Sequence, residues 1–137
     1  MVTITKLAEE LSEICVQDNE YTFDVQSIPG DVEVLRIRTE GRQEIPIYLT
    51  ITSDEILCMA YLFREDEIKK EKVSEMQNIM LSMNVPMPLS SFAKVDQQYV
   101  VFGALSANSN ISEIAHEVET LSENSVEALD ALQEYLV

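Results

Sequence analysis

The fold of this chain is decided by two neighbouring segments, Ile45-Pro46-Ile47-Tyr48-Leu49-Thr50-Ile51 and Ile56-Leu57-Cys58-Met59-Ala60-Tyr61-Leu62-Phe63. In the first segment apolar residues take every second position, as in a strand with one buried face. The second is apolar throughout and too short to be a helix with a polar side of its own. Such a run is typical of a strand that is covered above and below or flanked on both edges. We therefore predict that it lies in the middle of a sheet.

Upstream of these segments the sequence predicts a helix and two strands. An amphipathic helix is expected from about Thr5 to Val16, because apolar residues recur there at helical spacing. Its predicted apolar stripe consists of Leu7, Leu11, Ile14 and Cys15. Tyr21 to Val25 fits a short edge strand and Val32 to Thr39 a longer one. A hairpin at Glu40-Gly41-Arg42-Gln43 then leads into the central segments.

Downstream, the apolar period changes from two to that of a helix and then back. We predict a helix from about Asp66 to Met83. Two further strands follow, Phe92 to Val95 and Tyr99 to Ser106, joined by a tight turn. The second of these is apolar on both faces, so we expect it to pair beside Ile56 to Phe63.

The last predicted helix runs from about Ile111 to Leu136. Asn110 followed by Glu113 forms a capping-box pattern at its start. A helix of this length exceeds the strands, so it must overhang, bend or break, and the weak place is Asn124 with its serine neighbours. We predict a continuous helix with a bend there, because its apolar stripe keeps its phase.

Together these elements predict a single α+β domain over residues 1–137, in the order helix, three strands, helix, two strands, helix. The sheet is expected to be antiparallel, with five strands in the order 1-2-3-5-4, or six strands if Tyr21 to Val25 is included. The helices are expected to pack mainly on one face. Phe92 to Val95 would then be an edge strand, available for pairing between subunits.

The chain is short and strongly acidic, with 137 residues, a net charge of -16 and 46% apolar residues. This charge repels nucleic-acid phosphates and anionic lipid, so neither is an expected partner. It favours cationic partners, or it serves only to keep the protein soluble.

The sequence also predicts no membrane insertion, because no apolar stretch approaches the roughly twenty residues of a membrane span. The N-terminus lacks an apolar signal region, and Cys15 and Cys58 fit small buried thiols better than a disulfide. These features predict a cytoplasmic protein.

The sequence offers no catalytic, metal-binding or cofactor-binding constellation. The only histidine, His116, is followed by Glu117, but Thr120 stands where a zinc protease has its second histidine. Phosphate-binding glycine loops and a nucleophile elbow are also missing. We therefore predict a protein that is not an enzyme and that uses neither a cofactor nor a metal.

Two groups of residues indicate binding. A predicted hairpin carries a third of the basic residues, Arg36, Arg38 and Arg42, with Arg36 and Arg38 on a common strand face. These arginines either hold an acidic partner or pair with the protein's own carboxylates. The second group is rich in methionine, whose flexible thioether suits both an adaptable peptide-binding surface and the filling of irregular gaps in a core. The predicted protein-binding residues are Arg36, Arg38, Met76, Met80, Met83 and Met87.

Three segments of the chain resemble the YjfI family of small bacterial proteins: Glu55 to Phe63, Val85 to Phe92 and Tyr99 to Ser106. The resemblance covers most of the chain and is most specific at Pro88 to Phe92 and Phe102 to Ser106. That family has no assigned function and no catalytic residues to transfer. Some of its members are encoded near PspA-like envelope-stress proteins, so the resemblance implies a PspA-like partner. The element order is also similar to that of type III secretion chaperones, which are small, acidic, cytoplasmic and usually dimeric.

These observations predict a non-enzymatic protein-binding module of a bacterial cytoplasm. We expect a homodimeric adaptor or chaperone-like protein that holds a partner segment in a groove of helix and sheet near the methionines. The alternative is a regulator or enzyme that binds a small ligand between the sheet and the helices. The absence of a catalytic constellation and the element order favour the protein-binding hypothesis, although fold alone does not determine function.

Overall fold

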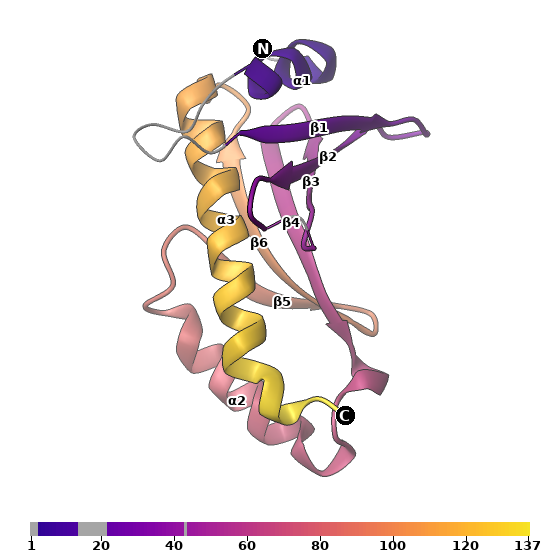
Figure 1. Ribbon diagram of the computed structural model, residues 1–137, viewed down its shortest axis with the longest axis vertical. Coiled ribbons are helices and arrows are strands. Elements are labelled where there is room, and N and C mark those ends of the chain that lie inside the picture. Colours follow the sequence, from indigo (N-terminus) through magenta and orange to yellow (C-terminus); the bar gives the residue numbers. More distant parts are fainter. Residues whose placement is uncertain (1–2, 14–21, 43) are drawn as a thin grey trace.

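The computed structural model describes residues 3–13, 22–42 and 44–137 (Figure 1). Its α-helices are α1 (Ile4–Glu13), α2 (Val73–Asn84) and α3 (Ile111–Leu132). Its strands are β1 (Phe23–Ile28), β2 (Val34–Thr39), β3 (Ile47–Ile51), β4 (Glu55–Arg64), β5 (Ser91–Val95) and β6 (Gln98–Ser106). Short 3-10 helices are η2 (Glu65–Glu67), η3 (Lys70–Lys72) and η4 (Gln133–Tyr135). The predicted α+β class and element order are confirmed, and the optional early strand is present as β1.

The six strands form one antiparallel sheet in the order β1-β2-β3-β4-β6-β5. The predicted order of the five main strands is therefore confirmed, with β1 added outside β2. β4 pairs with β3 on one edge and β6 on the other, so the apolar run does lie in the middle of the sheet. β1 and β5 are the edge strands.

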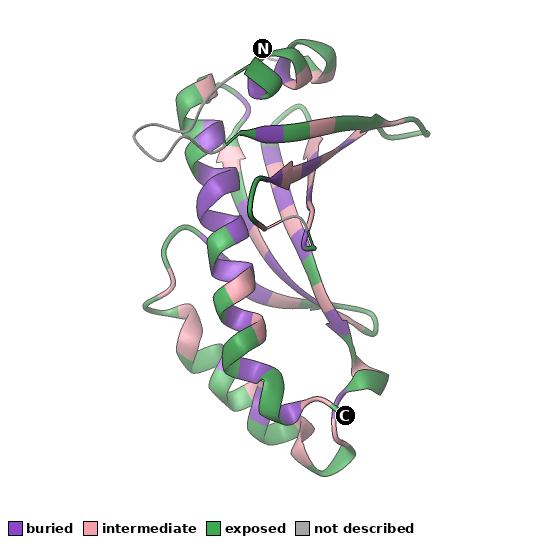
Figure 2. Cartoon of the chain, in the orientation of Figure 1, coloured by how far each residue is buried: buried purple, intermediate pink, exposed green. Residues whose placement is uncertain are grey.

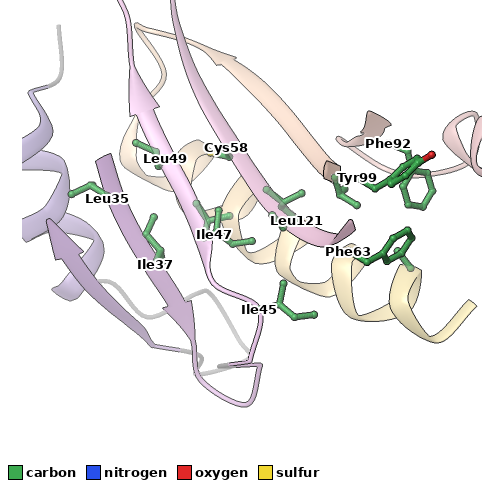
Figure 3. Close-up of a cluster of buried hydrophobic side chains, with 14 of the residues drawn as sticks. Leu35, Ile37, Ile45, Ile47, Leu49, Cys58, Phe63, Phe92, Tyr99 and Leu121 are labelled. Atoms are coloured by element: carbon green, nitrogen blue, oxygen red, sulfur yellow. The ribbon is translucent and has the colours of Figure 1, made fainter. Parts of the chain in front are cut away.

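One face of the sheet is covered by helices (Figure 1). α3 lies across β4 and β6, and α1 packs beside β1. On this side Ile56, Cys58 and Ala60 of β4 are completely buried. Figure 3 shows Cys58 and Leu121 of α3 among the buried side chains of this core. A register shift after Tyr61 turns Phe63 to the same side, as a β-bulge does. Burial of a side chain as large as Ile56 or Phe63 contributes about 1.5–3 kcal/mol to stability.

The other face of β4 is open. Leu57 and Met59 are half-buried and Tyr61 is 50% exposed, whereas the residues between them are buried (Figure 2). Of the two explanations for the apolar run, cover on both faces is wrong, and neighbours on both edges is right. The residues of the run itself do not separate the two explanations, because a strand is equally apolar whether its second face is covered by its own chain or left open.

Helix α2 is shorter than the sequence predicts. The prediction of a helix from Asp66 is wrong, because the regular helix begins at Val73 and two 3-10 turns precede it. Backbone hydrogen bonds to the end of the chain explain the difference. The Lys69 amide donates to the Tyr135 carbonyl at 2.8 Å, and the Val137 amide donates to the Glu67 carbonyl at 2.9 Å. These long-range bonds use backbone groups that an α-helix would have paired locally.

Helix α3 is continuous through Asn124, as predicted, and the bend predicted there stays a prediction. The helix ends at Leu132 instead of Leu136, and η4 follows it. Its start is also as predicted, because the Glu113 amide donates to Asn110 Oδ1 at 2.9 Å. For the first helix, the structure confirms the amphipathic turn with Leu7 and Leu11 buried. The predicted positions of Cys15 and of the helix end at Val16 lie outside the described residues.

Candidate functional site

The face of the sheet that the helices leave uncovered presents an apolar surface. The register places Tyr48 of β3 opposite Met59 of β4, and Met59 opposite Phe102 of β6, so these three side chains project from the same face. The Tyr48 and Tyr61 rings lie 5.2 Å apart between centroids. A hollow of about 500 Å³ lies on this face, lined by Ile28, Val34, Tyr48, Thr50, Leu57, Met59 and Tyr61. We call this surface the open sheet face.

The two predicted binding arginines lie at the β2 side of the open sheet face. Arg36 stands opposite Tyr48 in the β2–β3 register, and Arg38 lies two residues further along the same strand. Nη2 of Arg36 donates to Gln26 Oε1. Its Nε is buried and has no acceptor in the part of the chain that the structure describes. Arg38 stands opposite Asp24 in the β1–β2 register and already interacts with other groups of the protein. The predicted common face of Arg36 and Arg38 is therefore present, next to an apolar hollow.

Arg42, the third arginine of this hairpin, binds side chains of the protein's own helix α3. Arg42 Nη2 lies 2.9 Å from Glu119 Oε1, and its Nε donates to Ser122 Oγ at 3.0 Å. Both charged side chains are largely buried. Arg42 therefore ties the β2–β3 hairpin to the middle of α3, and the sequence-based suggestion of pairing with the chain's own carboxylates holds at this position.

The methionines do not gather on one surface. Met76 and Met80 are buried in the core, whereas Met83 and Met87 are half-buried. Met83 and Met87 line a small hollow of about 220 Å³ against α3. Met59 projects from the open sheet face instead. The accessible methionines are therefore in two separate places, and a direct role for Met76 and Met80 in binding stays a prediction that requires α2 to move.

A second apolar surface lies at α2 and the β5 edge. Residues 76–93 contain no charged residue, although the chain as a whole is 25% charged. Leu81 is 68% exposed and Val85 is 89% exposed, and Leu89 and Val95 are also exposed. Beside Leu81 lies a hollow of about 220 Å³ between α2 and β5, lined further by Gln77, Met80, Phe92, Ala93, Lys94 and Tyr99. We call this surface the α2–β5 surface.

A polar cluster closes one end of that hollow. Gln77 Nε2 donates to the Tyr99 hydroxyl at 2.8 Å, and the hydroxyl donates to Glu65 Oε1 at 3.1 Å. Lys94 Nζ lies 3.0 Å from the same carboxylate oxygen. The hydrogen bond from Lys94, followed by that from Tyr99, lowers the pKa of Glu65. The cluster is a partly exposed, satisfied ion pair next to a buried tyrosine, which is a structural arrangement common on protein surfaces.

Two further buried titratable groups, Cys58 of β4 and Glu117 of α3, lie where α3 packs on the sheet. Burial, with a smaller contribution from Glu117, raises the pKa of the Cys58 thiol to about 12, so this thiol stays protonated and unreactive. Burial also raises the pKa of Glu117, whose carboxylate packs against Gly103 of β6. His116 is exposed to solvent.

Within residues 3–13, 22–42 and 44–137, no three His, Cys, Asp or Glu side chains are grouped to hold a metal ion. No helix among these residues is long and apolar enough to cross a membrane.

Sequence reasoning missed most of the open sheet face. Tyr48, Leu57, Tyr61 and Phe102 were assigned to strands, but none was proposed to contact a partner. A signal was present, because only three helices were predicted for both faces of a sheet of five or six strands. Helices that few cannot cover both faces, so one apolar face had to remain open.

Solved structures place the fold in a defined class. The chain is similar to YbjN of Escherichia coli, a candidate transcription regulator, with a TM-score of 0.66, 16% identity, and 99% of this chain and 96% of that chain covered. It is also similar to a chain of the heterodimeric ExoU-SpcU complex from the type III secretion system of Pseudomonas aeruginosa, with a TM-score of 0.56, 10% identity, and coverage of 93% and 96%. A chain of the ExsC-ExsE complex gives a TM-score of 0.52, 11% identity, and coverage of 99% and 97%. The fold is therefore α+β of the type III secretion chaperone-like class, as predicted.

The family is also clear. The chain belongs to the DUF2170 family, described as an uncharacterized protein conserved in bacteria, whose model matches residues 1–136. The uncharacterized protein YjfI of Escherichia coli strain K12 is 28% identical over 112 residues, which cover 79% of this chain and 83% of that protein. The same values hold for YjfI of Escherichia coli O157:H7. The predicted resemblance to YjfI is confirmed.

Proposed function

We propose that this chain is a non-enzymatic protein-binding module, an adaptor or chaperone-like protein of the bacterial cytoplasm. The open sheet face carries this proposal. An extensive apolar surface on a soluble chain marks an interaction site, since single scattered apolar residues need no explanation but contiguous ones do. The chaperone-like fold supports the same conclusion, because two of the similar chains come from complexes of two different proteins.

The partner segment is proposed to lie on the open sheet face. The sequence predicts a groove of helix and sheet near Met76, Met80, Met83 and Met87. The open sheet face is a different place, and the methionine that lines its hollow is Met59. Met83 and Met87, the accessible methionines on the helical side, provide a second, smaller contact region. A PspA-like protein is the first partner to test, because the resemblance to the YjfI family implies it.

A photo-crosslinking amino acid at Tyr61 is expected to capture a specific protein in bacterial cells. The side chain there is exposed in the centre of the open sheet face, so a bound segment lies within reach. Mass spectrometry identifies the captured protein, and binding is then measured with the two purified proteins, a PspA-like protein included. The matched control places the same amino acid at Glu123, which is exposed on α3. Equal capture at both positions, or no binding between the purified proteins, would contradict the proposal.

The α2–β5 surface is proposed to join two copies into a homodimer. A chain with a net charge of -16 repels its own copy, and this repulsion is weakest where a large uncharged surface is exposed. Such a surface on α2 is continuous with edge strand β5, which suits an isologous contact. One outer backbone group of β5 is already used, because the Phe92 amide donates to Asn84 Oδ1 at 2.7 Å. Side chains of α2 are therefore expected to carry most of the contact.

Introducing charge on the α2–β5 surface is expected to separate the two copies. Leu81→Glu combined with Val85→Glu places two carboxylates in each half of the contact, and buried carboxylates without partners are strongly disfavoured. Sedimentation equilibrium should give twice the 15.5 kDa monomer mass for the wild type and the monomer mass for the variant. Ser74→Glu, on an exposed position of the same helix, is the control and should stay dimeric. A monomeric wild type at 100 μM, or a dimeric double variant, would exclude this interface.

The alternative of a small-ligand site has weaker support. The hollow between α2 and β5 is where such a ligand would lie between helix and sheet, but its volume of about 220 Å³ is below the roughly 300–1,000 Å³ of typical ligand pockets. A thermal-shift screen of metabolites distinguishes the two functions. A large stabilisation by one compound would favour the alternative, since a ligand that binds only the folded state must raise its apparent stability.

A further inference from the structure

We infer that the segment held on the open sheet face is acidic and amphipathic, with carboxylates that contact Arg36 and an apolar side chain that enters the hollow beside Tyr48. This inference rests on the proposed function and specifies the chemistry of its partner. It follows from the kind of contact that the face allows, from its charges, and from the acceptor that Arg36 lacks.

The open sheet face can recognise a partner only through side chains. The backbone donors and acceptors of β3, β4 and β6 are already used in the ladders that join these strands, so a segment lying over the face cannot add to the sheet. The hollow of about 500 Å³ is lined almost entirely by aliphatic and aromatic side chains. It therefore fits an aliphatic or aromatic side chain of the partner, whose burial contributes most of the affinity.

The charges of the face point to carboxylates. Along β3, β5 and β6 of the described sheet, the positions that project from the open face are uncharged, and in β4 the residues Leu57, Met59 and Tyr61 are uncharged too. Beside them β2 contributes Arg36 and Arg38, which are two of only nine basic residues in the chain. An arginine at the border of an apolar surface selects carboxylates, because its planar guanidinium binds them with paired hydrogen bonds.

Arg36 has unused binding capacity. Its Nη2 group donates to the neutral side-chain amide of Gln26, and its Nε donor is buried without an acceptor in the described chain. A buried donor without an acceptor costs free energy until one is supplied. A partner carboxylate in the place of Gln26 would turn a neutral hydrogen bond into a charge-assisted one and draw the guanidinium into a fully bonded position.

A second copy of this chain does not have the required pattern on its own open face. The carboxylates that project from that face are Asp24, which stands opposite Arg38 within its own sheet, and Glu55 at the end of β4. Two copies packed face to face would bring two apolar centres together without a carboxylate for each Arg36. A basic partner would be attracted by the net charge of -16 but repelled at this face. An acidic segment of another protein is the remaining match.

Two peptide sets test the inference on the full chain. Both sets consist of fluorescein-labelled 14-residue peptides in which leucine and phenylalanine occupy the same alternating positions. The positions between them are glutamate in one set and lysine in the other. Fluorescence anisotropy at 150 mM salt is expected to give at least about tenfold tighter binding of a glutamate peptide, a difference within the range measured for interfacial charge pairs. Amide chemical shifts of β3, β4 and β6 should report the binding, whereas those of α3 should not.

Three variants locate the preference. Arg36→Gln combined with Arg38→Gln should abolish the preference for glutamate, by weakening the binding of glutamate peptides without weakening that of lysine peptides. Met59→Lys should remove the binding of both sets. Lys6→Gln combined with Lys70→Gln, an equal loss of two positive charges outside the sheet, is the control and should change neither. Circular dichroism verifies that each variant is folded.

Each remaining outcome overturns either the inference alone or the inference together with the proposed function. Equal affinity for the two peptide sets, lost in Met59→Lys, would overturn the acidic preference and leave the proposed function standing. Tighter binding of lysine peptides would also overturn the inference. Conversion of a wild-type dimer into monomers by Met59→Lys would show that a second copy occupies the face. Absence of peptide binding together with equal crosslinking at Tyr61 and Glu123 would overturn both the inference and the proposed function.

Discussion

Replacing Arg42 with methionine is expected to lower the free energy of unfolding by about 3 kcal/mol. The side chain of Arg42 is largely buried, and it is bonded to the Glu119 carboxylate and the Ser122 hydroxyl of α3. Without the guanidinium, the Glu119 charge stays in a nearly closed site and has no partner there, which costs more than the ion pair contributed. Urea unfolding followed by circular dichroism measures the change.

The matched control for this prediction removes both charges. The double variant with Arg42→Met and Glu119→Met should regain most of the lost stability, because apolar side chains of similar size can replace a buried ion pair at little cost. Lys94→Met is a second control, since its ion pair with Glu65 is much more exposed and should change stability by less than about 1 kcal/mol. A loss in Arg42→Met as small as that in Lys94→Met would show that the hairpin is not held to α3 through this pair.

Replacing Gly103 with alanine is expected to destabilise the protein by about 2 kcal/mol. A Cβ at this position in β6 would overlap the Glu117 carboxylate and would lie 2.9 Å from the Leu89 carbonyl oxygen. Glycine is thus required for the close approach of α3 and the preceding connection to the sheet. Thermal and urea unfolding of the variant measure the loss.

A shorter side chain on α3 should reduce this cost. With Glu117→Ala in the background, the overlap with the carboxylate is gone and only the contact with the Leu89 carbonyl remains, so the effect of Gly103→Ala should be about half as large. Ala104→Val is the control on the next residue of the same strand, where the side chain projects from the open face and extra volume is tolerated. Equal costs in the two backgrounds would mean that the Glu117 carboxylate moves aside freely.

Several features of the fold could be predicted because they depend on local geometry. Alternation from Ile47 to Ile51 follows from a two-residue side-chain period, and the Asn110–Glu113 pair caps a helix through contacts three residues apart. The pairing of β4 between β3 and β6 followed from its length and apolarity. These features depend on residues that are close together in the sequence, so they can be predicted without knowledge of the rest of the fold.

The long-range contacts of the polar residues in the middle of α3 could not be predicted from the sequence. Ser122 and Asn124 were interpreted as a weak place in the helix, yet they bind segments distant in sequence. Ser122 accepts from Arg42, and the Asn124 amide donates to the Pro88 carbonyl at 2.8 Å and to Ser90 Oγ at 2.9 Å. A polar residue on a helix looks the same whether it faces water or a partner loop, and only the folded chain distinguishes the two.

The sequence by itself determined the class of fold, the order of the strands and the lack of a recognisable catalytic motif. The tertiary structure alone decided which apolar residues were left uncovered. It buried Met76 and Met80, left Tyr61 and Leu81 exposed, and placed Arg36 at the border of an apolar hollow. The reason is physical: periodicity is set by the backbone of each element, whereas burial depends on how many other elements reach a given face.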